Sequence, residues 1–228
     1  RKRLPIYVSL GNHDLGGLGL ESKLVDHYLE YAESHDWFYY PEEYWEKRVG
    51  PVHLVSIHTN PLAYKGTKKK PQGQLVQKAL QKTSADWTIV FGHHPYRSNG
   101  QHGNAGEYEG IPGDLTPLGG EYRKWVNKYV CDKVDFLLTG HDHNRQWIKE
   151  MDELTGDVLG GGSSDACETK MAVSGAGAKT RGMKDRGNDL AFGKGTLGFL
   201  LLEFHKRKVE VEYVDDKGKT EWSKTVTK

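Results

Sequence analysis

A short apolar run leads directly into two histidines in the stretch Val134-Asp135-Phe136-Leu137-Leu138-Thr139-Gly140-His141-Asp142-His143-Asn144. The run Val134–Thr139 predicts a buried strand, because it is short, apolar and bounded by glycine. His141 and His143 then stand one residue apart at the carboxyl end of this strand. Imidazole nitrogens in that position can face a common cleft as metal ligands. The stretch therefore predicts an α/β sheet with a metal site at its carboxyl edge.

Two further stretches have the same form. Gly11-Asn12-His13-Asp14 follows the apolar run Leu4–Leu10, and Gly92-His93-His94-Pro95 follows Trp87–Phe91. A lone histidine is more often a hydrogen-bonded structural residue than a ligand. Three such units, each at the carboxyl end of a predicted strand, instead indicate one shared site, where ligands gather in α/β sheets. We expect this site to hold two metal ions.

The chain changes character after the histidine pair. Before it, apolar periodicity predicts strands at 4–10, 52–58, 87–91 and 134–139, and amphipathic helices at 21–34, 74–84 and 121–131. After it, successive strands are predicted at 146–151, 170–174, 197–204, 209–214 and 220–227. We expect a solvated basic loop at 65–70 and an active-site loop at 99–120, which is long and rich in Gly and Pro. The pattern predicts one layered domain with an α/β part and an antiparallel β part.

Composition limits the possible partners. Among 228 residues, 32 Lys and Arg face 31 Asp and Glu, so no overall field favours nucleic acid or an anionic membrane. No apolar run approaches the roughly 20 residues of a membrane span. The two cysteines, Cys131 and Cys167, are either separate small side chains or one disulfide, and the sequence leaves both readings open. A disulfide would place the protein outside the cytosol.

The three histidine units resemble the last three of the five motifs of the calcineurin-like metallophosphoesterases. The similarity is greatest to the small purple acid phosphatases of the tartrate-resistant type. It extends through Trp87-Thr88-Ile89-Val90-Phe91-Gly92-His93, Gly140-His141-Asp142-His143-Asn144 and Val173-Ser174-Gly175-Ala176-Gly177. This resemblance implies a layered β-sandwich flanked by helices, in the order α/β/β/α.

The resemblance also implies a metal-ligand set. It assigns Asn12, His93 and His141 to a divalent metal and His143 to a second metal, Fe(III) in the purple enzymes. The expected cofactors are therefore two metal ions, Fe(III) with Fe(II), Zn(II) or Mn(II). Imidazole nitrogen and amide oxygen are suitable donors for these metals.

Further residues are assigned around the metals by the same resemblance. His13 would lie beside the substrate phosphate and protonate the leaving group, and Asp14 would orient His13. His102, nine residues after His93, would be a second substrate-side histidine, and His94 would line the pocket wall. His27, His35, His53, His58 and His205 match no motif and are expected to be structural.

The implied activity is that of an acid phosphatase that hydrolyses phosphomonoesters of small phosphorylated substrates. Two cations roughly 3.5–4 Å apart can bind a phosphate ester and lower the pKa of a bound water until hydroxide attacks phosphorus. A histidinium beside the site can supply the proton to the leaving group, so we expect activity to fall above neutral pH. A phosphodiesterase or nucleotide hydrolase of the same fold is the neighbouring alternative.

The chain departs from the family at its start. The first two motifs, which supply an aspartate to the first metal and a bridging aspartate, are not found before Gly11. We therefore expect residues 1–228 to be the C-terminal portion of a single metallophosphoesterase domain whose N-terminal part is missing. A preceding segment or a partner chain would then carry the remaining ligands.

Two non-catalytic readings remain. The chain could be a truncated phosphatase-like module, or a structural zinc domain, which is poorer because structural zinc sites favour cysteine. The expected location, by resemblance, is secreted or periplasmic.

Overall fold

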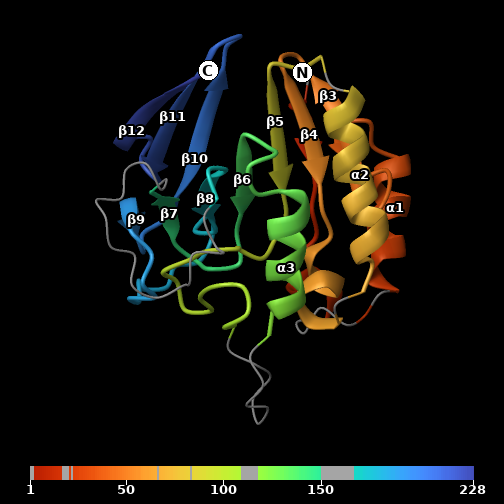
Figure 1. Ribbon diagram of the computed structural model, residues 1–228, viewed down its shortest axis with the longest axis horizontal. Helices are drawn as coiled ribbons and strands as arrows, with labels where there is room; N and C mark the ends of the chain where they lie inside the picture. Colours follow the sequence, from red (N-terminus) through yellow and green to blue (C-terminus); the bar gives the residue numbers. More distant parts are fainter. Residues whose placement is uncertain are drawn as a thin grey trace.

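A seven-stranded mixed sheet forms the centre of the molecule (Figure 1). The computed structural model describes residues 3–16, 21, 23–65, 67–82, 84–108, 118–149 and 167–228. The strand order is β3-β4-β5-β6-β8-β7-β9, in which β4, β5, β6 and β8 are parallel and β3 and β7 run antiparallel to their neighbours. The strands are β3 (Trp45–Val49), β4 (Val52–Ser56), β5 (Trp87–Phe91), β6 (Phe136–Thr139), β7 (Arg145–Ile148), β8 (Lys170–Ser174) and β9 (Leu190–Lys194).

Two helices cover one face of this sheet. They are α2 (Lys69–Lys82) and α3 (Gly120–Tyr129). Each presents apolar residues at helical spacing, and the resulting core holds Val76, Ala79, Trp125 and Val126 against Val55, Val90 and Leu137 of the strands. The central strands are apolar on both faces because the opposite face is covered as well.

A second, antiparallel sheet covers that opposite face. It consists of β10 (Gly198–Phe204), β11 (Lys208–Asp215) and β12 (Thr220–Thr227). Alternate residues of β11 point inward, and Val209, Val211 and Tyr213 pack on Trp87, Phe136 and Trp147 of the large sheet. The two sheets therefore enclose a second core.

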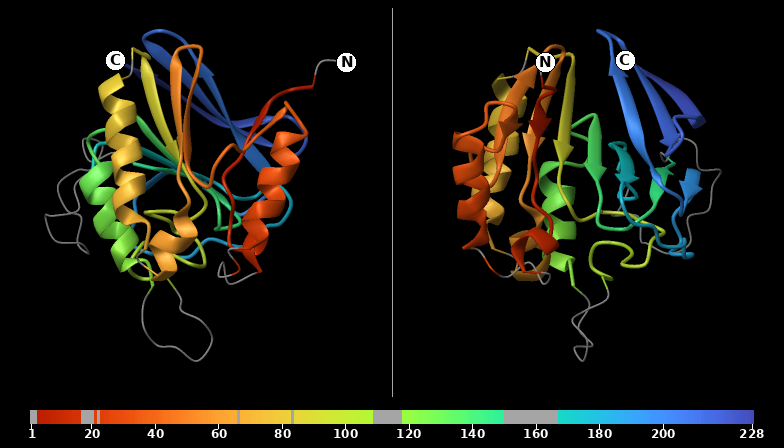
Figure 2. Two further views of the ribbon diagram at one scale, coloured as in Figure 1. Left: turned by 90° about the vertical axis from the view of Figure 1, so that its right-hand side faces the viewer. Right: turned by 180° about the vertical axis from the view of Figure 1, so that it is seen from behind.

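The N-terminal part forms a third unit on the same side as this second sheet. The short parallel pair β1 (Ile6–Tyr7) and β2 (Phe38–Tyr39) packs with α1 (Leu24–Glu33) around Leu10, Val25 and Tyr40. The left view of Figure 2 places α1 on the side of the sheet opposite α2 and α3. The helices thus lie outside and the strands inside, which confirms the predicted α/β/β/α layering.

Most of the predicted elements are present, with shifted ends. The predicted strands at 87–91, 170–174 and 220–227 agree with β5, β8 and β12. Helix α2 begins at Lys69, so Lys69 and Lys70 belong to a helix and the expected basic loop at 65–70 is wrong there. Part of the predicted active-site loop, residues 109–117, lies outside the described residues, as do residues 150–151 at the end of the predicted strand 146–151.

Three strands were not predicted. Strand β2 has two residues, too few to show a period. Strand β3 carries three charged residues in five and lies at the edge of the sheet. Strand β9 contains a glycine and ends in lysine. Short or edge strands lack the apolar alternation that makes a strand visible in sequence.

Two further features concern the sequence expectations. Cys131 and Cys167 form a disulfide, which decides between the two readings of the cysteines. Within the described residues, the helices are all too short or too polar to span a membrane.

Candidate metal centre

The two central strands β5 and β6 bring His93 and His141 to the same edge of the sheet. The strands are parallel neighbours, with Val90 beside Leu137, so the loops that follow them leave from the same end. The amide of Gly140 donates to the carbonyl of His93 at 3.0 Å, which ties the two loops together at the backbone. Sequence reasoning predicted this edge correctly.

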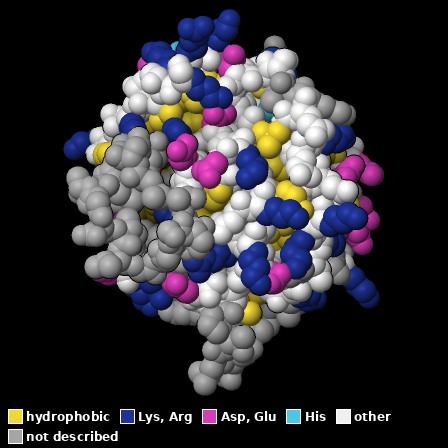
Figure 3. Space-filling model, viewed as in Figure 1, with side chains coloured by type: hydrophobic (Ala, Val, Ile, Leu, Met, Phe, Trp, Pro, Cys, Tyr) yellow, Lys and Arg dark blue, Asp and Glu magenta, His cyan; other side chains and the backbone are white. Residues whose placement is uncertain are grey.

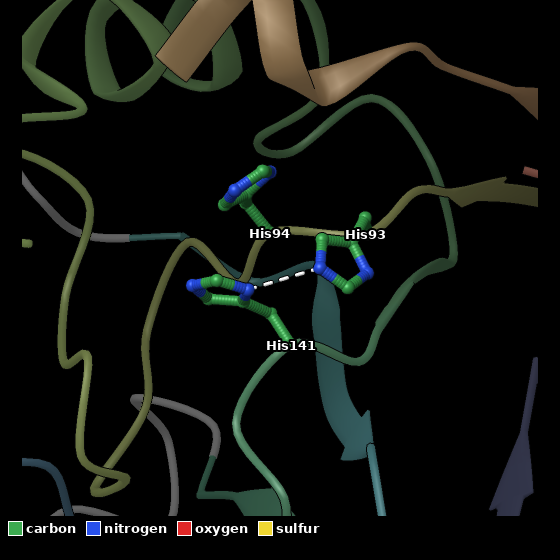
Figure 4. A group of neighbouring side chains, drawn as sticks. All are labelled: His93, His94 and His141. Carbon is green, nitrogen blue, oxygen red and sulfur yellow. Dashed lines mark hydrogen bonds between the residues drawn. The ribbon is translucent and has the colours of Figure 1, made fainter. Parts of the chain in front are cut away.

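Three of the four predicted ligands converge on one point. Nε2 of His93 lies 2.7 Å from Oδ1 of Asn12 and 2.9 Å from Nδ1 of His141. Figure 4 shows the imidazoles of His93 and His141 turned toward each other, with a dashed line between the two nitrogens. One amide oxygen and two imidazole nitrogens therefore meet from three different loops.

Burial keeps these imidazoles neutral. It lowers the pKa of His93 to about 4, with the nearby carboxylate of Asp14 acting in the opposite direction. Burial likewise lowers the pKa of His141 to about 2, and the neighbouring histidines His93 and His102 add to the effect. A neutral imidazole has a nitrogen lone pair to offer, which is the form that a metal ion requires.

His94 lies in the same cluster but its nitrogens are already engaged. His93, His94 and His141 form a group whose ligand atoms lie within 4.8 Å of one another (Figure 4). However, Nδ1 of His94 is 2.8 Å from the hydroxyl of Thr59, and its Nε2 is 3.0 Å from the hydroxyl of Tyr64. The side chain is fully buried, and its expected place in the pocket wall stays a prediction.

The fourth predicted ligand, His143, has an imidazole nitrogen without a hydrogen-bond partner among the described residues. This nitrogen, Nδ1, is buried. The pKa of His143 is lowered by burial and by the positive charges of Arg181 and Lys179. A buried nitrogen without a partner is costly unless something binds it, which is the expected condition of a ligand atom.

The two predicted substrate-side histidines lie at this cluster. His13 is exposed and begins the short 3-10 helix η1 (His13–Leu15), and it is among the groups that lower the pKa of His93 and His141. The ring of His102 lies 4.2 Å from the ring of His141, centre to centre. The structure thus brings all six predicted histidine and asparagine positions together.

Asp14 makes contacts that differ from the expected ones. Its Oδ2 accepts a hydrogen bond from the amide of Gly11 at 2.8 Å, and its Oδ1 accepts one from the hydroxyl of Tyr28 at 2.9 Å. Among the described residues, no hydrogen bond joins Asp14 to His13. The carboxylate closes a tight turn at the start of η1 instead, so it fixes the backbone that carries Asn12.

Sequence reasoning missed the role of Asp142. This residue is buried, and its carboxylate accepts hydrogen bonds from the hydroxyl of Ser98 at 2.6 Å and the amide of His102 at 2.9 Å. It therefore joins the histidine pair to the loop that carries His102. The only sequence signal was its position between His141 and His143. That position does not distinguish a buried, hydrogen-bonded aspartate from an exposed one.

The remaining histidines that the structure describes in detail make structural contacts. His53 lies 2.9 Å from a carboxylate oxygen of Glu46, and His58 lies 3.0 Å from one of Glu43. Both pairs are far in sequence from the histidine units. Nε2 of His58, like Nδ1 of His143, is buried without a hydrogen-bond partner among the described residues, so the structural role of these histidines stays a prediction.

The donor set fits a metal ion. Asn12, His93 and His141 supply one oxygen and two nitrogens at a single point, and His143 adds a buried nitrogen without a partner. Neutral imidazoles and an amide oxygen suit zinc, iron and manganese. Buried histidines that do not bind a metal normally have both ring nitrogens hydrogen-bonded to neighbouring groups, as His94 does here.

Comparison with known proteins gives the same classification. A family model described as calcineurin-like phosphoesterase matches residues 1–145. In Arabidopsis thaliana, purple acid phosphatase 4 is 33% identical over 91 residues, covering 40% of this chain and 23% of that protein. Purple acid phosphatase 7 is 26% identical over 175 residues, covering 69% of this chain and 48% of that protein. The matches thus span less than half the length of these curated relatives.

Two solved structures share the fold. GAP50, described as the anchor in the inner membrane complex of Plasmodium, gives a TM-score of 0.67 at 18% identity, over 98% of this chain and 66% of that one. Purple acid phosphatase PPD1 from yellow lupin seeds gives 0.54 at 20% identity, over 84% and 34%. These likenesses concern the fold, whereas the family match covers more than half of the chain. The chain therefore belongs to the calcineurin-like phosphoesterase family.

Proposed function

We propose that this chain carries the catalytic centre of a metal-dependent phosphoric ester hydrolase that acts on phosphomonoesters at a binuclear metal centre. The observation that supports this most strongly is the meeting of Asn12, His93 and His141 within 2.7–2.9 Å, beside the unpartnered nitrogen of His143. Family membership adds the reaction class, because phosphoester hydrolysis is the activity for which the family is named.

The four ligands divide unequally between two metal ions. Asn12, His93 and His141 would hold a divalent ion, and His143 would bind the other, with Fe(III) paired with Fe(II), Zn(II) or Mn(II) as the proposed metals. The second ion requires further ligands from outside this set, in a preceding segment or a partner chain. Bound cations would offset the charge of a phosphate ester and lower the pKa of water beside it.

The chain's own residues would position the ester and its leaving group. His13 is exposed at the start of η1, where an imidazolium can donate a proton to a departing oxygen. His102 lies against His141, where it can hydrogen-bond to a phosphate oxygen. Asp142 fixes the amide of His102, so the loop that bears this histidine is held in place before substrate binds.

The disulfide supports a location outside the cytosol. A bond between Cys131 and Cys167 persists in oxidising compartments and is uncommon where glutathione keeps thiols reduced. We propose that the protein works in a secreted or periplasmic setting.

Metal analysis combined with hydrolysis tests the proposal. The purified protein is analysed for metals and assayed with p-nitrophenyl phosphate and bis(p-nitrophenyl) phosphate. We expect bound metal, faster hydrolysis of the monoester, and loss of metal and turnover in His141→Ala and His143→Ala. His35→Ala removes a histidine just beyond the end of α1, outside the groups of described side chains that could hold a metal ion, and should retain both properties.

Each other outcome contradicts a defined part of the proposal. Faster hydrolysis of the diester would assign the site to a phosphodiesterase of the same fold. Metal binding without hydrolysis of either ester would leave a non-catalytic module, a role that would be compatible with the anchor described for GAP50. Absence of metal from the protein after incubation with Zn(II), Mn(II) and Fe(II) would refute the metal centre itself.

A further inference from the structure

Tyr64 is hydrogen-bonded to His94, the member of the cluster His93, His94 and His141 that is not a proposed metal ligand. Tyr64 lies in the short helix η2 (Pro61–Lys65), between β4 and α2. Its hydroxyl oxygen is 3.0 Å from Nε2 of His94, and the two rings meet edge to face with their centres 5.1 Å apart. The ring of His94 lies 4.4 Å from that of His141, centre to centre (Figure 4). The Tyr64 hydroxyl is therefore linked to a proposed metal ligand through a single imidazole.

Thr59 lies on the other side of the His94 ring and fixes the direction of the hydrogen bonds there. Its hydroxyl oxygen accepts a hydrogen bond from the amide of His94 at 3.1 Å and lies 2.8 Å from Nδ1 of the same residue. Thr59 is fully buried, and among the described residues its hydroxyl hydrogen has no acceptor other than Nδ1. A buried hydroxyl that donates to nothing costs about 1–3 kcal/mol. Thr59 therefore donates to Nδ1 of His94.

His94 must then carry its own hydrogen on Nε2. Its ring is fully buried and is hydrogen-bonded only to hydroxyl groups, which favours the neutral form. A neutral imidazole has a single N–H, so the nitrogen that accepts from Thr59 cannot also donate. Nε2 therefore donates to the hydroxyl oxygen of Tyr64. The reverse arrangement would leave the buried hydroxyl of Thr59 unpaired, whereas this one leaves only the hydrogen of the half-buried Tyr64.

The hydroxyl hydrogen of Tyr64 thus has no acceptor among the described residues. Two other tyrosines that contact the segment after β5 differ in this respect. Tyr108 donates to the carbonyl of Pro95, and Tyr122 donates to the carbonyl of His94 at 3.1 Å. Because the side chain of Tyr64 is only half-buried, a molecule that enters from outside can supply the acceptor.

We propose that the hydroxyl of Tyr64 donates a hydrogen bond to the phosphate group of the substrate. This inference rests on the proposed function and adds a substrate-binding residue to it. The donors of Thr59, His94 and Tyr64 follow one another in a single direction, and hydrogen bonds in such a chain polarise and strengthen one another. His94 positions the tyrosine and leaves the metal ions to the neighbouring histidines. A charged phosphate oxygen suits this donor, because hydrogen bonds to charged groups are the stronger ones.

The tautomer of His94 can be measured without any substrate. Nitrogen NMR of the full chain, labelled with ¹⁵N in its histidines and loaded with Zn(II), shows which ring nitrogen carries the hydrogen. The signals of His94 are identified by their loss in His94→Gln. We expect the hydrogen on Nε2. A hydrogen on Nδ1 and none on Nε2 would overturn the proposal, because Tyr64 would then donate to Nε2 and have no hydrogen for phosphate.

Phosphate binding tests the contact itself. Inorganic phosphate is titrated calorimetrically into the Zn(II)-loaded wild-type protein and into Tyr64→Phe, which removes only the hydroxyl group. We expect the dissociation constant to rise about tenfold, the effect of one hydrogen bond to a charged group, while the zinc content stays the same. The value of kcat/KM for p-nitrophenyl phosphate should fall by a similar factor. Unchanged phosphate affinity in Tyr64→Phe would overturn the proposal whether or not the protein hydrolyses phosphoesters.

Thr59→Val separates this contact from a structural effect. Valine has nearly the same shape but cannot donate to His94, so the chain loses its first donor and Tyr64 becomes a weaker one. Phosphate affinity should fall in Thr59→Val by less than in Tyr64→Phe. The two changes together should cost no more than Tyr64→Phe alone. Losses that simply add would contradict the proposed chain of donors.

Two controls account for surface charge and for the loss of a tyrosine hydroxyl elsewhere. Figure 3 shows acidic side chains among the lysines and arginines of the face formed by α2 and α3, where Lys124 binds Glu121 at 2.8 Å. Lys124→Ala removes a cation from that face, and Tyr31→Phe removes a hydroxyl from an exposed residue of α1. Both should bind phosphate as wild type does, and a loss in either that equals the loss in Tyr64→Phe would overturn the proposal. A wild-type protein that binds phosphate through Tyr64 yet hydrolyses no ester would refute the proposed function and leave this inference standing.

Discussion

The α-carbon of Gly11 packs directly against the imidazole of His93. A Cβ added at Gly11 would lie 2.7 Å from both Nδ1 and Cε1 of that ring, closer than real carbon atoms approach. On its other side, the amide of Gly11 donates to the carboxylate of Asp14. The glycine is thus held between two parts of the site and leaves no room for a side chain.

Gly11→Ala should therefore disturb the metal centre through a single methyl group. The ring of His93 must move or the turn at Asp14 must open, so we expect metal affinity to fall by about tenfold or more. Overpacking should cost about 1–3 kcal/mol of the free energy of unfolding. Zn(II) titration and urea unfolding measure the two effects.

Gly120→Ala provides the matched control, because a Cβ there meets nothing within 4 Å at the start of α3. It should leave metal affinity unchanged. Equal metal affinity in Gly11→Ala and Gly120→Ala would show that the packing of Gly11 does not position His93.

The sequence predicted the meeting of these side chains better than it predicted their surroundings. His93 and His141 lie together because the parallel strands β5 and β6 present their carboxyl ends at one edge of the sheet. Asn12 reaches the same point from a separate two-stranded sheet, β1-β2. The partners of Asp14 could not be predicted in the same way. Its contact with Tyr28 depends on how α1 packs over η1, a tertiary relationship that leaves no local pattern.

Asp142→Asn should loosen the loop that carries His102. The carboxylate accepts from both Ser98 and His102, whereas an amide has only one oxygen and places its NH₂ group against the second donor. We expect a loss of about 1–3 kcal/mol in the free energy of unfolding. Amide hydrogen exchange should become faster at residues 98–104, as measured by mass spectrometry.

Asp216→Asn is the comparison for this change, since Asp216 is exposed in the turn between β11 and β12. It should alter neither stability nor exchange at residues 98–104. Unchanged exchange at these residues in Asp142→Asn would mean that Gly100 and the contacts of Arg186 hold the loop without the carboxylate.

The same limit applies to the fold. The long apolar strands and the helices with regular spacing were predicted, whereas β3 was not. Its three charged residues hide the apolar pattern of a strand, and only the finished sheet shows that β3 is an edge strand. The start of α2 was also missed. Lys69 and Lys70 look like solvated residues in sequence, yet the ammonium of Lys69 binds Glu121 of α3 across the helix pair.

Glu43 should make stability depend on pH in the acid range. Its hydrogen bond with His58, together with Lys68, lowers the pKa of the carboxyl to about 2. Because the folded pKa lies below the unfolded one, the stabilisation is present above about pH 4.5 and is lost as the pH falls toward 2. After allowance for screening by solvent, we expect Glu43→Gln to cost about 1 kcal/mol at pH 7.

Urea unfolding at pH 7 and near pH 2.5 tests this dependence. The difference between wild type and Glu43→Gln should shrink toward zero at the lower pH, where the wild-type carboxyl is becoming protonated. The exposed neighbour in Glu42→Gln should show almost no difference at either pH. A difference that is the same at both pH values would contradict the assignment of the shift to the charged pair.

The disulfide between Cys131 and Cys167 should contribute strongly to stability. It joins Cys131, two residues after the end of α3, to Cys167, before β8, over a separation of 36 residues, and both cysteines are buried. A crosslink over a loop of this length restricts the unfolded chain and so stabilises the fold by roughly 3–4 kcal/mol.

We therefore expect the urea midpoint to fall on reduction with dithiothreitol. It should be equally low in the Cys131→Ala, Cys167→Ala double variant with or without reductant. Because β6 and β8 are paired in parallel next to the metal ligands, the reduced protein should retain metal affinity as long as it stays folded. Identical midpoints for oxidised and reduced wild-type protein would show that the crosslink does not stabilise this fold.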